Sequence, residues 1–212
     1  MDRPAPLSFA TLPRPAFGRA AQHVETTAPR LTTRPDRRHQ RAALLAAELL
    51  PELPAPGETV HSLMLGTFDL CQVIGATAKL LPTLTHLRIA TLCYSKRNVK
   101  ELAALLETRK CALTLLVSVF FREHNKENHE RSVAELTAYP NVKVAAARTH
   151  CKVVCFDLGD GDGLTFESSA NLRANRNREQ LTATRARALH DWHSAWIDEL
   201  VSKDNAGQEE KA

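Results

Sequence analysis

Polar side chains suited to handling a phosphate group gather in the last third of the chain. On an extended strand, side chains alternate between the two faces of the sheet, so His150 and Lys152 should point the same way. On the strand expected next, the same rule groups Glu167, Ser169 and Asn171. A hairpin between the two strands would bring both groups of side chains together.

Each of these side chain types has a use at a phosphate. Lys152 supplies positive charge, and Ser169 and Asn171 supply hydrogen-bond donors. His150 can attack phosphorus or move a proton near neutral pH. The sequence therefore predicts a site for phosphate binding and phosphoryl transfer.

The spacing of these residues resembles a known family signature, HxKxxxxD followed by GSxN, of the phospholipase D superfamily. The matching segments are His150-Cys151-Lys152 with Asp157, then Ser168-Ser169-Ala170-Asn171, and then Asn177-Arg178-Glu179, which is similar to the later Asn-x-Glu element. The resemblance in the order of elements covers roughly residues 58–201. It implies an α/β fold: a phospholipase D-like mixed β-sheet flanked by helices on both faces, with a single copy of the motif.

The resemblance also implies a role for each matching residue. His150 becomes the nucleophile, and Lys152 and Asn171 become the pair that binds the substrate phosphate, with Ser169 as a supporting donor. Glu179 becomes the carboxylate that orients a histidine. The acidic position of the motif is taken by Asp157, but its strand parity places it opposite His150, so a structural role is an alternative for it.

Chemistry of this family needs two histidines: one forms a phosphohistidine, and the other protonates the leaving group and later activates the second nucleophile. The chain offers one such motif, because the His-x-Arg segments at His39 and His86 lack the lysine. Members with a single motif pair two chains across a two-fold axis. The resemblance therefore implies a homodimer, a phosphodiesterase that needs no metal, and no cofactor.

One position departs from the family pattern, because Ser168 stands where the motif has glycine. A serine fits if its backbone is ordinary for a strand, whereas a positive φ would strain the site.

A nuclease that cleaves DNA or RNA is the favoured function. The alternatives are a phospholipid hydrolase and a non-catalytic module that binds nucleic acid or phosphate through a degenerate site.

Periodicity predicts the elements that must position these residues. Up to Pro140, strands alternate with helices, which favours parallel strands covered by helices on two faces. The expected strands are 60–65, 86–94 and 112–121, and the expected helices are 68–81, 98–108 and 125–139. Three strands then follow in quick succession at 142–149, 152–157 and 164–169, with a glycine-rich hairpin turn at 159–163. Two closing helices are expected at 178–188 and 190–201, and a flexible tail at 202–212.

The first part of the chain differs from the rest in charge and composition. Residues 1–42 hold eight arginines against three acidic residues, and nine of the 11 prolines lie at or before Pro56. We therefore expect residues 1–56 to form a largely disordered arm, with a helix at 36–50 that docks on the domain or on a partner, and residues 57–201 to form the catalytic domain. The arm is either an electrostatic contact for nucleic acid or anionic lipid, or a solvated tail.

Other features of the sequence favour a cytoplasmic protein. The longest apolar runs are too short for a membrane helix, and the first residues lack the apolar stretch of a secretory signal. Five cysteines lie within apolar segments and are expected to be reduced core residues. The Cys and Asp spacings fit neither a zinc knuckle nor a calcium loop. His124 and His129 are expected in a solvated helix start or lining a substrate groove, and the group His190, Trp192, His193 and Trp196 in core or dimer packing.

Overall fold

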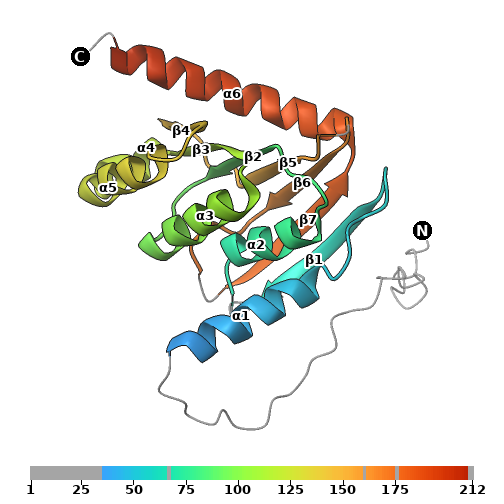
Figure 1. Cartoon of the computed structure of the whole chain (residues 1–212). Coiled ribbons are helices and arrows are strands. Elements are labelled where there is room, and N and C mark those ends of the chain that lie inside the picture. Colours follow the sequence, from blue (N-terminus) through green and yellow to red (C-terminus); the bar gives the residue numbers. More distant parts are fainter. Residues whose placement is uncertain (1–34, 66–67, 160, 175–176, 210–212) are drawn as a thin grey trace, which may run out of the picture. The chain divides into compact units, whose positions relative to one another are not determined.

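A seven-stranded mixed β-sheet organises the chain, with helices on both of its faces (Figure 1). The computed structural model describes residues 35–65, 68–159, 161–174 and 177–209, and of these it describes the side chains from 40 to 204. The strand order across the sheet is β1-β7-β6-β5-β2-β3-β4. The α/β fold expected from the sequence is confirmed.

The strands are β1 (Thr59–Leu65), β2 (His86–Thr91), β3 (Ala112–Ser118), β4 (Val142–Ala147), β5 (Val153–Asp157), β6 (Gly163–Ser168) and β7 (Arg178–Arg185). The helices are α1 (Pro35–Leu49), α2 (Leu70–Leu80), α3 (Lys96–Arg109), α4 (Val119–His124), α5 (Lys126–Thr137) and α6 (Arg187–Glu209).

Strand directions place many chain ends at a single edge of the sheet. β2 is parallel to β3 and β3 to β4, whereas β5 is antiparallel to β2 and the pairs β5·β6, β6·β7 and β7·β1 are all antiparallel. The last residues of β1, β6, β2, β3 and β4 therefore lie at the same edge as the first residues of β5 and β7. We call this the catalytic edge, after the catalytic role proposed below for the motif residues that lie there.

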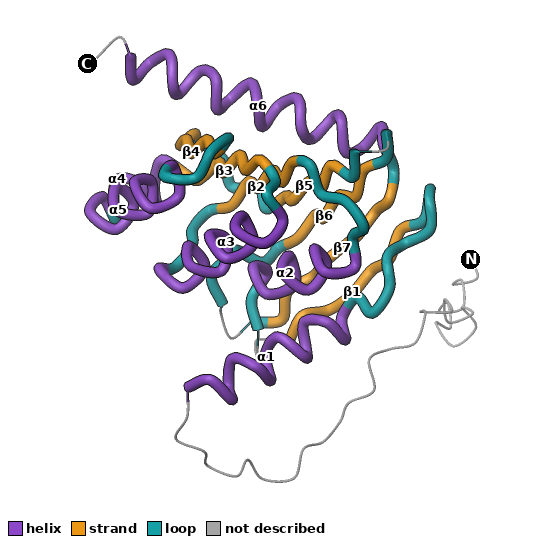
Figure 2. The backbone as a smooth tube through the Cα atoms, viewed as in Figure 1, coloured by secondary structure: helices purple, strands orange, loops and turns teal. Residues whose placement is uncertain are grey.

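The two faces of the sheet are covered differently (Figure 2). The larger core joins one face to α1, α2, α3 and α5, and it includes Leu87, Ile89, Val154 and Phe156. The opposite face packs on α6 through a smaller apolar cluster that contains Ala90, Cys155, Ile197 and Val201. Alternation along β2 and β5 thus sends successive side chains to different cores, as the pleat requires.

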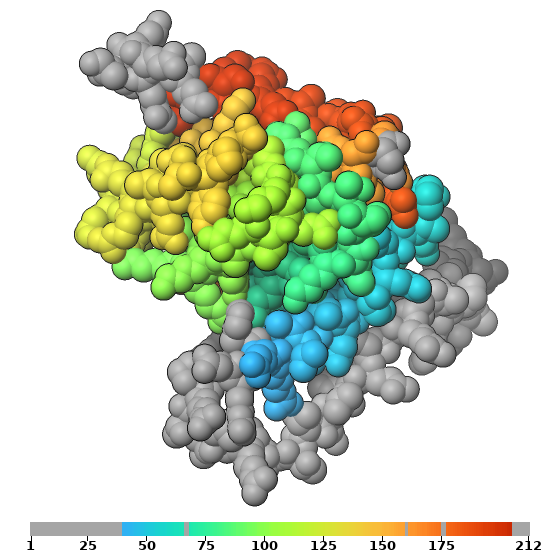
Figure 3. All heavy atoms as spheres, viewed as in Figure 1, coloured from blue at the N-terminus to red at the C-terminus, as the bar shows by residue number. Residues whose placement is uncertain are grey.

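The helix expected at 36–50 is present as α1, and it belongs to the compact unit that begins at Thr32. Its Ala42 and Ala46, followed by Leu50, are buried in the larger core beside α2 and β1. In the space-filling view the blue surface of α1 adjoins the green surface of α2 (Figure 3). The remainder of the expected arm, residues 1–34, lies outside the described residues.

The prediction of a helix at 178–188 is wrong, because residues 178–185 form strand β7. β7 pairs with β6 on one side and with β1 on the other, and Leu181 and Ala183 are buried at alternate positions. Two ladders of backbone hydrogen bonds therefore outweigh the helix-forming tendency of Glu179 and Gln180.

Two other elements end later or earlier than expected. The strand expected at 112–121 ends at Ser118, and the short helix α4 follows. The Ser118 hydroxyl caps this helix by accepting a hydrogen bond from Phe120 N. α6 continues through the segment expected to be a flexible tail and ends at Glu209. Asp204 stabilises this extension, because its carboxylate pairs with Arg122 and accepts from Ala146 N at 2.9 Å.

Cysteine placement follows the expectation in part. Cys71, Cys111 and Cys155 are buried free thiols and Cys93 is half-buried, whereas Cys151 is exposed because it precedes β5 in a loop. No helix of the described part of the chain is both long and apolar enough to cross a membrane.

Candidate active site

His150 and Lys152 lie at the catalytic edge, in the loop that leads into β5. The Lys152 ammonium is 3.0 Å from His150 Nδ1 and donates to the His150 carbonyl oxygen at 2.8 Å. The imidazole is exposed, and the lysine is half-buried. The HxK spacing therefore produces a contacting pair that opens to solvent, as expected from alternation on an extended chain.

Ser168, the residue in place of the motif glycine, fits its position without backbone strain. It is the last residue of β6, and its φ is not among the positive values found in the described residues. Its amide donates to Lys152 O at 3.0 Å, and its hydroxyl donates to Gln180 O at 2.6 Å. The hydroxyl also accepts from Ala170 N at 3.0 Å. Serine here connects three segments of the site.

Asn171 is held by the end of β2. Leu92 N donates to Asn171 Oδ1 at 3.2 Å, and the next residue along, Leu172, donates its amide to Thr91 Oγ1 at 3.3 Å. Because the backbone amide occupies the carboxamide oxygen, the Nδ2 group is the donor that Asn171 can present to a ligand. The asparagine is half-buried, so its position is set by the fold.

Ser169 and Glu179 form a second contact at the same edge. The Ser169 hydroxyl donates to Glu179 Oε2 in a short hydrogen bond, and it accepts from Gln180 N at 3.0 Å. Glu179 reaches this place because it is the second residue of β7, directly opposite Met64 of β1. The structure thus brings His150, Lys152, Ser169, Asn171 and Glu179 to one edge of the sheet.

Glu167 lies apart from this group, although alternation along the strand predicted that it would share a face with Ser169 and Asn171. Its Cα partner across the β5·β6 ladder is Val153, so it shares the face of Val153, and that face packs on α6. There Glu167 Oε1 is 3.3 Å from Nε2 of the buried His193. Because β6 ends at Ser168, Ser169 and Asn171 lie beyond the strand and need not share the face of Glu167.

Asp157 lies at the opposite edge, at the far end of β5. Its carboxylate accepts from Gly159 N at 3.2 Å and its carbonyl oxygen accepts from Thr85 N at 2.9 Å. It is thus separated from His150 by the length of the strand. Of the two roles left open by the sequence, the geometry favours the structural one, in which Asp157 supports the turn after β5.

Two further residues at this edge, Asp69 and Arg173, were not singled out from the sequence. They line a small cavity together with the motif residues Asn171, Asn177 and Glu179. Arg173 could have been found from its position two residues after the motif asparagine, whereas Asp69 comes from the distant start of α2.

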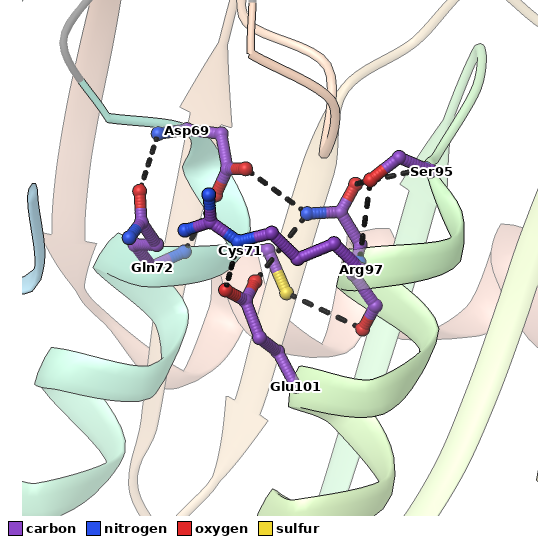
Figure 4. A network of polar contacts seen from close by, with 7 residues as sticks. Asp69, Cys71, Gln72, Ser95, Arg97 and Glu101 are labelled. Carbon is purple, nitrogen blue, oxygen red and sulfur yellow. Dashed lines mark hydrogen bonds and ion pairs between the residues drawn. The ribbon is translucent and has the colours of Figure 1, made fainter. Parts of the chain in front are cut away.

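Asp69 belongs to a buried polar network that fixes the starts of two helices (Figure 4). It caps α2 by accepting from Gln72 N at 2.9 Å, and it accepts from Asn98 Nδ2 at 3.0 Å near the start of α3. Ser95 caps α3 in the same capping-box pattern. Burial raises the pKa of the Asp69 carboxyl, against the lowering effect of these hydrogen bonds. These hydrogen bonds hold the starts of α2 and α3 in place beside the site.

Positive charge accompanies the motif at this edge. Burial raises the pKa of the Cys93 thiol, while Arg173 and Lys152 act on it in the opposite direction. Both cations are therefore close enough to Cys93 to influence its charge, and they extend a positive region past the end of β2. Such a region suits a polyanionic ligand. Within the described residues there is no group of three or more His, Cys, Asp or Glu that could hold a metal ion.

Comparison with solved structures finds similar folds at low sequence identity. Nuc from Salmonella typhimurium, described as a phospholipase D family member, has 14% identity and a TM-score of 0.49, and the match covers 68% of this chain and 94% of that one. NucT from Helicobacter pylori has 17% identity and a TM-score of 0.51, over 68% of this chain and 97% of that one. The chain has a phospholipase D-like fold.

Sequence comparisons add nothing to this result. No family model matches the chain, and no curated protein matches it. The phospholipase D-like fold thus rests on the architecture, and the site rests on the geometry of the motif residues.

Proposed function

We propose that the protein is a phosphodiesterase that cleaves nucleic acid without a metal, through a phosphohistidine formed in a homodimeric active site. The observation that carries this proposal is the gathering of His150, Lys152, Ser169, Asn171 and Glu179 at one edge of a phospholipase D-like fold. A nucleophile, a cation and an amide donor in one place are the groups that phosphoryl transfer needs.

In the first step, a ring nitrogen of His150 attacks the phosphorus and forms a P–N bond while the P–O bond to the leaving group breaks. The His150 of a second copy gives its proton to the departing oxygen. Lys152 and the Asn171 Nδ2 group from each copy stabilise the charge that builds up on the non-bridging oxygens.

In the second step, the histidine that gave up its proton takes one from water, and the resulting hydroxide oxygen attacks phosphorus. The P–N bond breaks, and its electron pair returns to the His150 ring. Both histidines then have their starting protonation, so the cycle is complete without oxidation or reduction.

Lys152 must change partner during this cycle. In the structure its ammonium donates a hydrogen bond to His150 Nδ1, so the lone pair of that nitrogen is engaged. A phosphate anion attracts an ammonium more strongly than a neutral imidazole does. We expect the substrate to draw Lys152 onto a phosphate oxygen and to leave a ring nitrogen of His150 available for attack.

A second copy is required because the full HxKxxxxD pattern occurs once in the chain, at His150, and β1 offers a surface for it. β1 is a terminal strand of the sheet, and its Leu63 and Leu65 are 64% and 48% exposed. Their Cα partners are Gln180 and Arg178, which flank Glu179 on β7. This exposed apolar pair therefore adjoins the catalytic edge, where the partner's His150 has to enter.

Nucleic acid is the favoured substrate because of the positive region at Lys152 and Arg173 and the arginines of residues 1–42. Strain at Ser168 would favour a degenerate binding module, and the φ of Ser168 gives no sign of such strain. A phospholipid substrate and a non-catalytic binding module are the alternatives. In the test below, headgroup release would support the first and absence of any cleavage the second.

The test incubates wild-type and His150→Ala protein with labelled single- and double-stranded DNA and RNA, and with phospholipid vesicles, in excess EDTA. We expect the wild type to cleave nucleic acid and the variant to lose on the order of 10³-fold or more in rate. His150 is exposed, so its replacement should leave the fold intact, which circular dichroism checks.

Headgroup release from the vesicles without cleavage of nucleic acid would replace the proposed substrate by phospholipid. Cleavage by both proteins would refute His150 as the nucleophile. A Leu63→Glu/Leu65→Glu variant should sediment as a monomer and lose activity, whereas an active monomer would refute the homodimeric mechanism.

A further inference from the structure

Beside the motif residues, a second and larger pocket opens at the catalytic edge, with a volume of about 150 Å³. One wall comes from the link between β2 and α3, at Tyr94, Ser95 and Lys96, and the facing wall comes from α5. Arg173 closes the side nearest to Asn171. The mechanism proposed above uses none of these residues.

Arg173 connects the pocket with the motif. It lines both this pocket and the small cavity that contains Asn171 and Glu179. Together with Lys152 it also acts electrostatically on Cys93, the residue before Tyr94. A ligand group in the pocket and a phosphate at Lys152 would therefore be neighbours, and Arg173 could contact the segment that joins them.

The α5 wall carries neutral polar side chains. Asn125, Asn128 and Ser132 recur at intervals of three and four residues, so they share one face of the helix. Asn125 is the N-cap of α5, and its side chain makes no capping hydrogen bond. A carboxamide has both a donor and an acceptor, and this combination matches the edge of a nucleobase.

The floor of the pocket is aromatic and held rigidly. The rings of Tyr94 and Phe121 are packed edge to face with centroids 4.7 Å apart. The Tyr94 hydroxyl lies 3.0 Å from Nδ1 of the buried His129. Burial raises the pKa of Tyr94 to about 12, so the phenol stays neutral. An uncharged, partly apolar floor beneath polar walls suits a planar heterocycle better than it suits a second phosphate.

We infer that this pocket binds the base of a nucleotide adjacent to the scissile phosphodiester. Asn125 and Asn128 contact the base, and Lys96 and Arg173 contact the sugar-phosphate backbone. The inference rests on the proposed function, and it specifies the substrate further. A base can enter the pocket only when it is unstacked and unpaired, so the site selects single-stranded nucleic acid.

The experiment measures the affinity of the full chain for a fluorescein-labelled 12-nucleotide single strand, and for a duplex of the same sequence, by anisotropy. Every variant is made in a His150→Ala background, so that the strand is not cleaved during the measurement. Asn125→Ala/Asn128→Ala should raise the Kd for the single strand about tenfold and leave the Kd for the duplex unchanged. Both asparagines are exposed, so the fold should persist. Arg173→Ala should also raise the Kd for the single strand.

Arg131→Ala is the matched control, because it removes one positive charge from α5 where Arg131 pairs with Glu127 outside the pocket. It should leave the Kd for the single strand within twofold of wild type. An unchanged Kd in the double asparagine variant, or an equal loss of affinity for single strand and duplex, would overturn the pocket assignment. Loss of single-strand affinity in the asparagine variant, when the chain with His150 intact cleaves no substrate, would support the pocket and refute the proposed catalysis, so the two failures are distinguishable.

Discussion

The two edges of the sheet carry similar kinds of residues in different states. At the catalytic edge, His150 and Lys152 contact each other and remain accessible to solvent. At the opposite edge, the comparable polar groups are engaged in the fold: Asp157 accepts from Gly159 N, and Arg185 pairs with Asp162 at 2.6 Å. Both edges lie at the ends of the same strands, so strand ends alone do not make a site.

The difference separates the motif residues that can meet a substrate from the one that supports the fold. β5 begins directly after the HxK pair and ends with Asp157, and its length keeps the two apart. A sequence signature therefore includes residues that do different work: those at one edge can meet a substrate, and the one at the other edge supports a turn. Substitutions at the two edges should therefore separate effects on the cleavage rate from effects on stability.

Loss of the ammonium should damage the catalytic edge most. Lys152→Ala should lower the rate of phosphodiester cleavage on the order of 10³-fold, because the charge that develops on phosphate oxygens loses a stabilising cation. Lys152→Arg should recover part of this loss. Single-turnover cleavage in EDTA measures both, and a Lys152→Ala rate within tenfold of wild type would contradict the assignment.

Ser169→Ala should have a smaller effect on the same reaction. The substitution removes the donor to Glu179 Oε2 and the acceptor of Gln180 N, so the carboxylate loses its fixed position. We expect the rate to fall about tenfold, with a smaller change in the melting temperature. Ser202→Ala, on an exposed turn of α6, is the control and should leave the rate unchanged.

Histidines whose pKa is lowered by burial should make stability depend on pH. Burial lowers the pKa of His86, His129 and His193 in the folded state. Below about pH 6.5, the unfolded chain then binds more protons than the folded chain, so stability falls as the pH decreases. We expect the melting temperature to drop by about 3 °C or more between pH 7.5 and 5.5.

Two variants test whether these histidines cause the dependence. His86→Gln should make the dependence of melting temperature on pH shallower, because glutamine can keep a hydrogen bond to Thr114 without titrating. Ser202→Ala, an exposed substitution that removes no histidine, should leave the dependence as in wild type. A melting temperature that is constant over this pH range would contradict the prediction.

Asp157→Ala tests the opposite edge directly. It should lower the free energy of unfolding by about 1 kcal/mol, through loss of the hydrogen bond from Gly159 N, and leave the cleavage rate within twofold of wild type. Urea unfolding and the cleavage assay measure the two quantities on the same preparation. A large loss of rate without loss of stability would show that Asp157 acts in catalysis.

Restoring the family glycine should change least. Ser168→Gly removes the hydroxyl that bonds Gln180 O and Ala170 N, and it adds backbone freedom. The free energy of unfolding should therefore fall by about 1 kcal/mol or less. The cleavage rate should not rise, because Ser168 has no positive φ to relieve. A marked gain in rate would show that serine restrains the site.

Most of the architecture followed from the sequence where local patterns agree with tertiary pairing. Short apolar runs and helical periodicity placed β1 to β6 and α1 to α3 within a few residues of their bounds. The exception is β7, where Glu179 and Gln180 favour a helix, while pairing with two neighbouring strands requires extended backbone. No local signal reports the presence of those neighbours.

Residue spacing identified the chemical groups of the candidate site, because the positions of His150, Lys152, Ser169 and Asn171 along the chain set their order on adjacent strands. Tertiary structure alone decided that Asp157 and Glu167 leave this group, since ladder register assigns each residue to an edge and a face. It also brought in Arg173 and the α5 pocket. Burial, register and the approach of distant helices depend on the whole fold, and no local window of sequence encodes them.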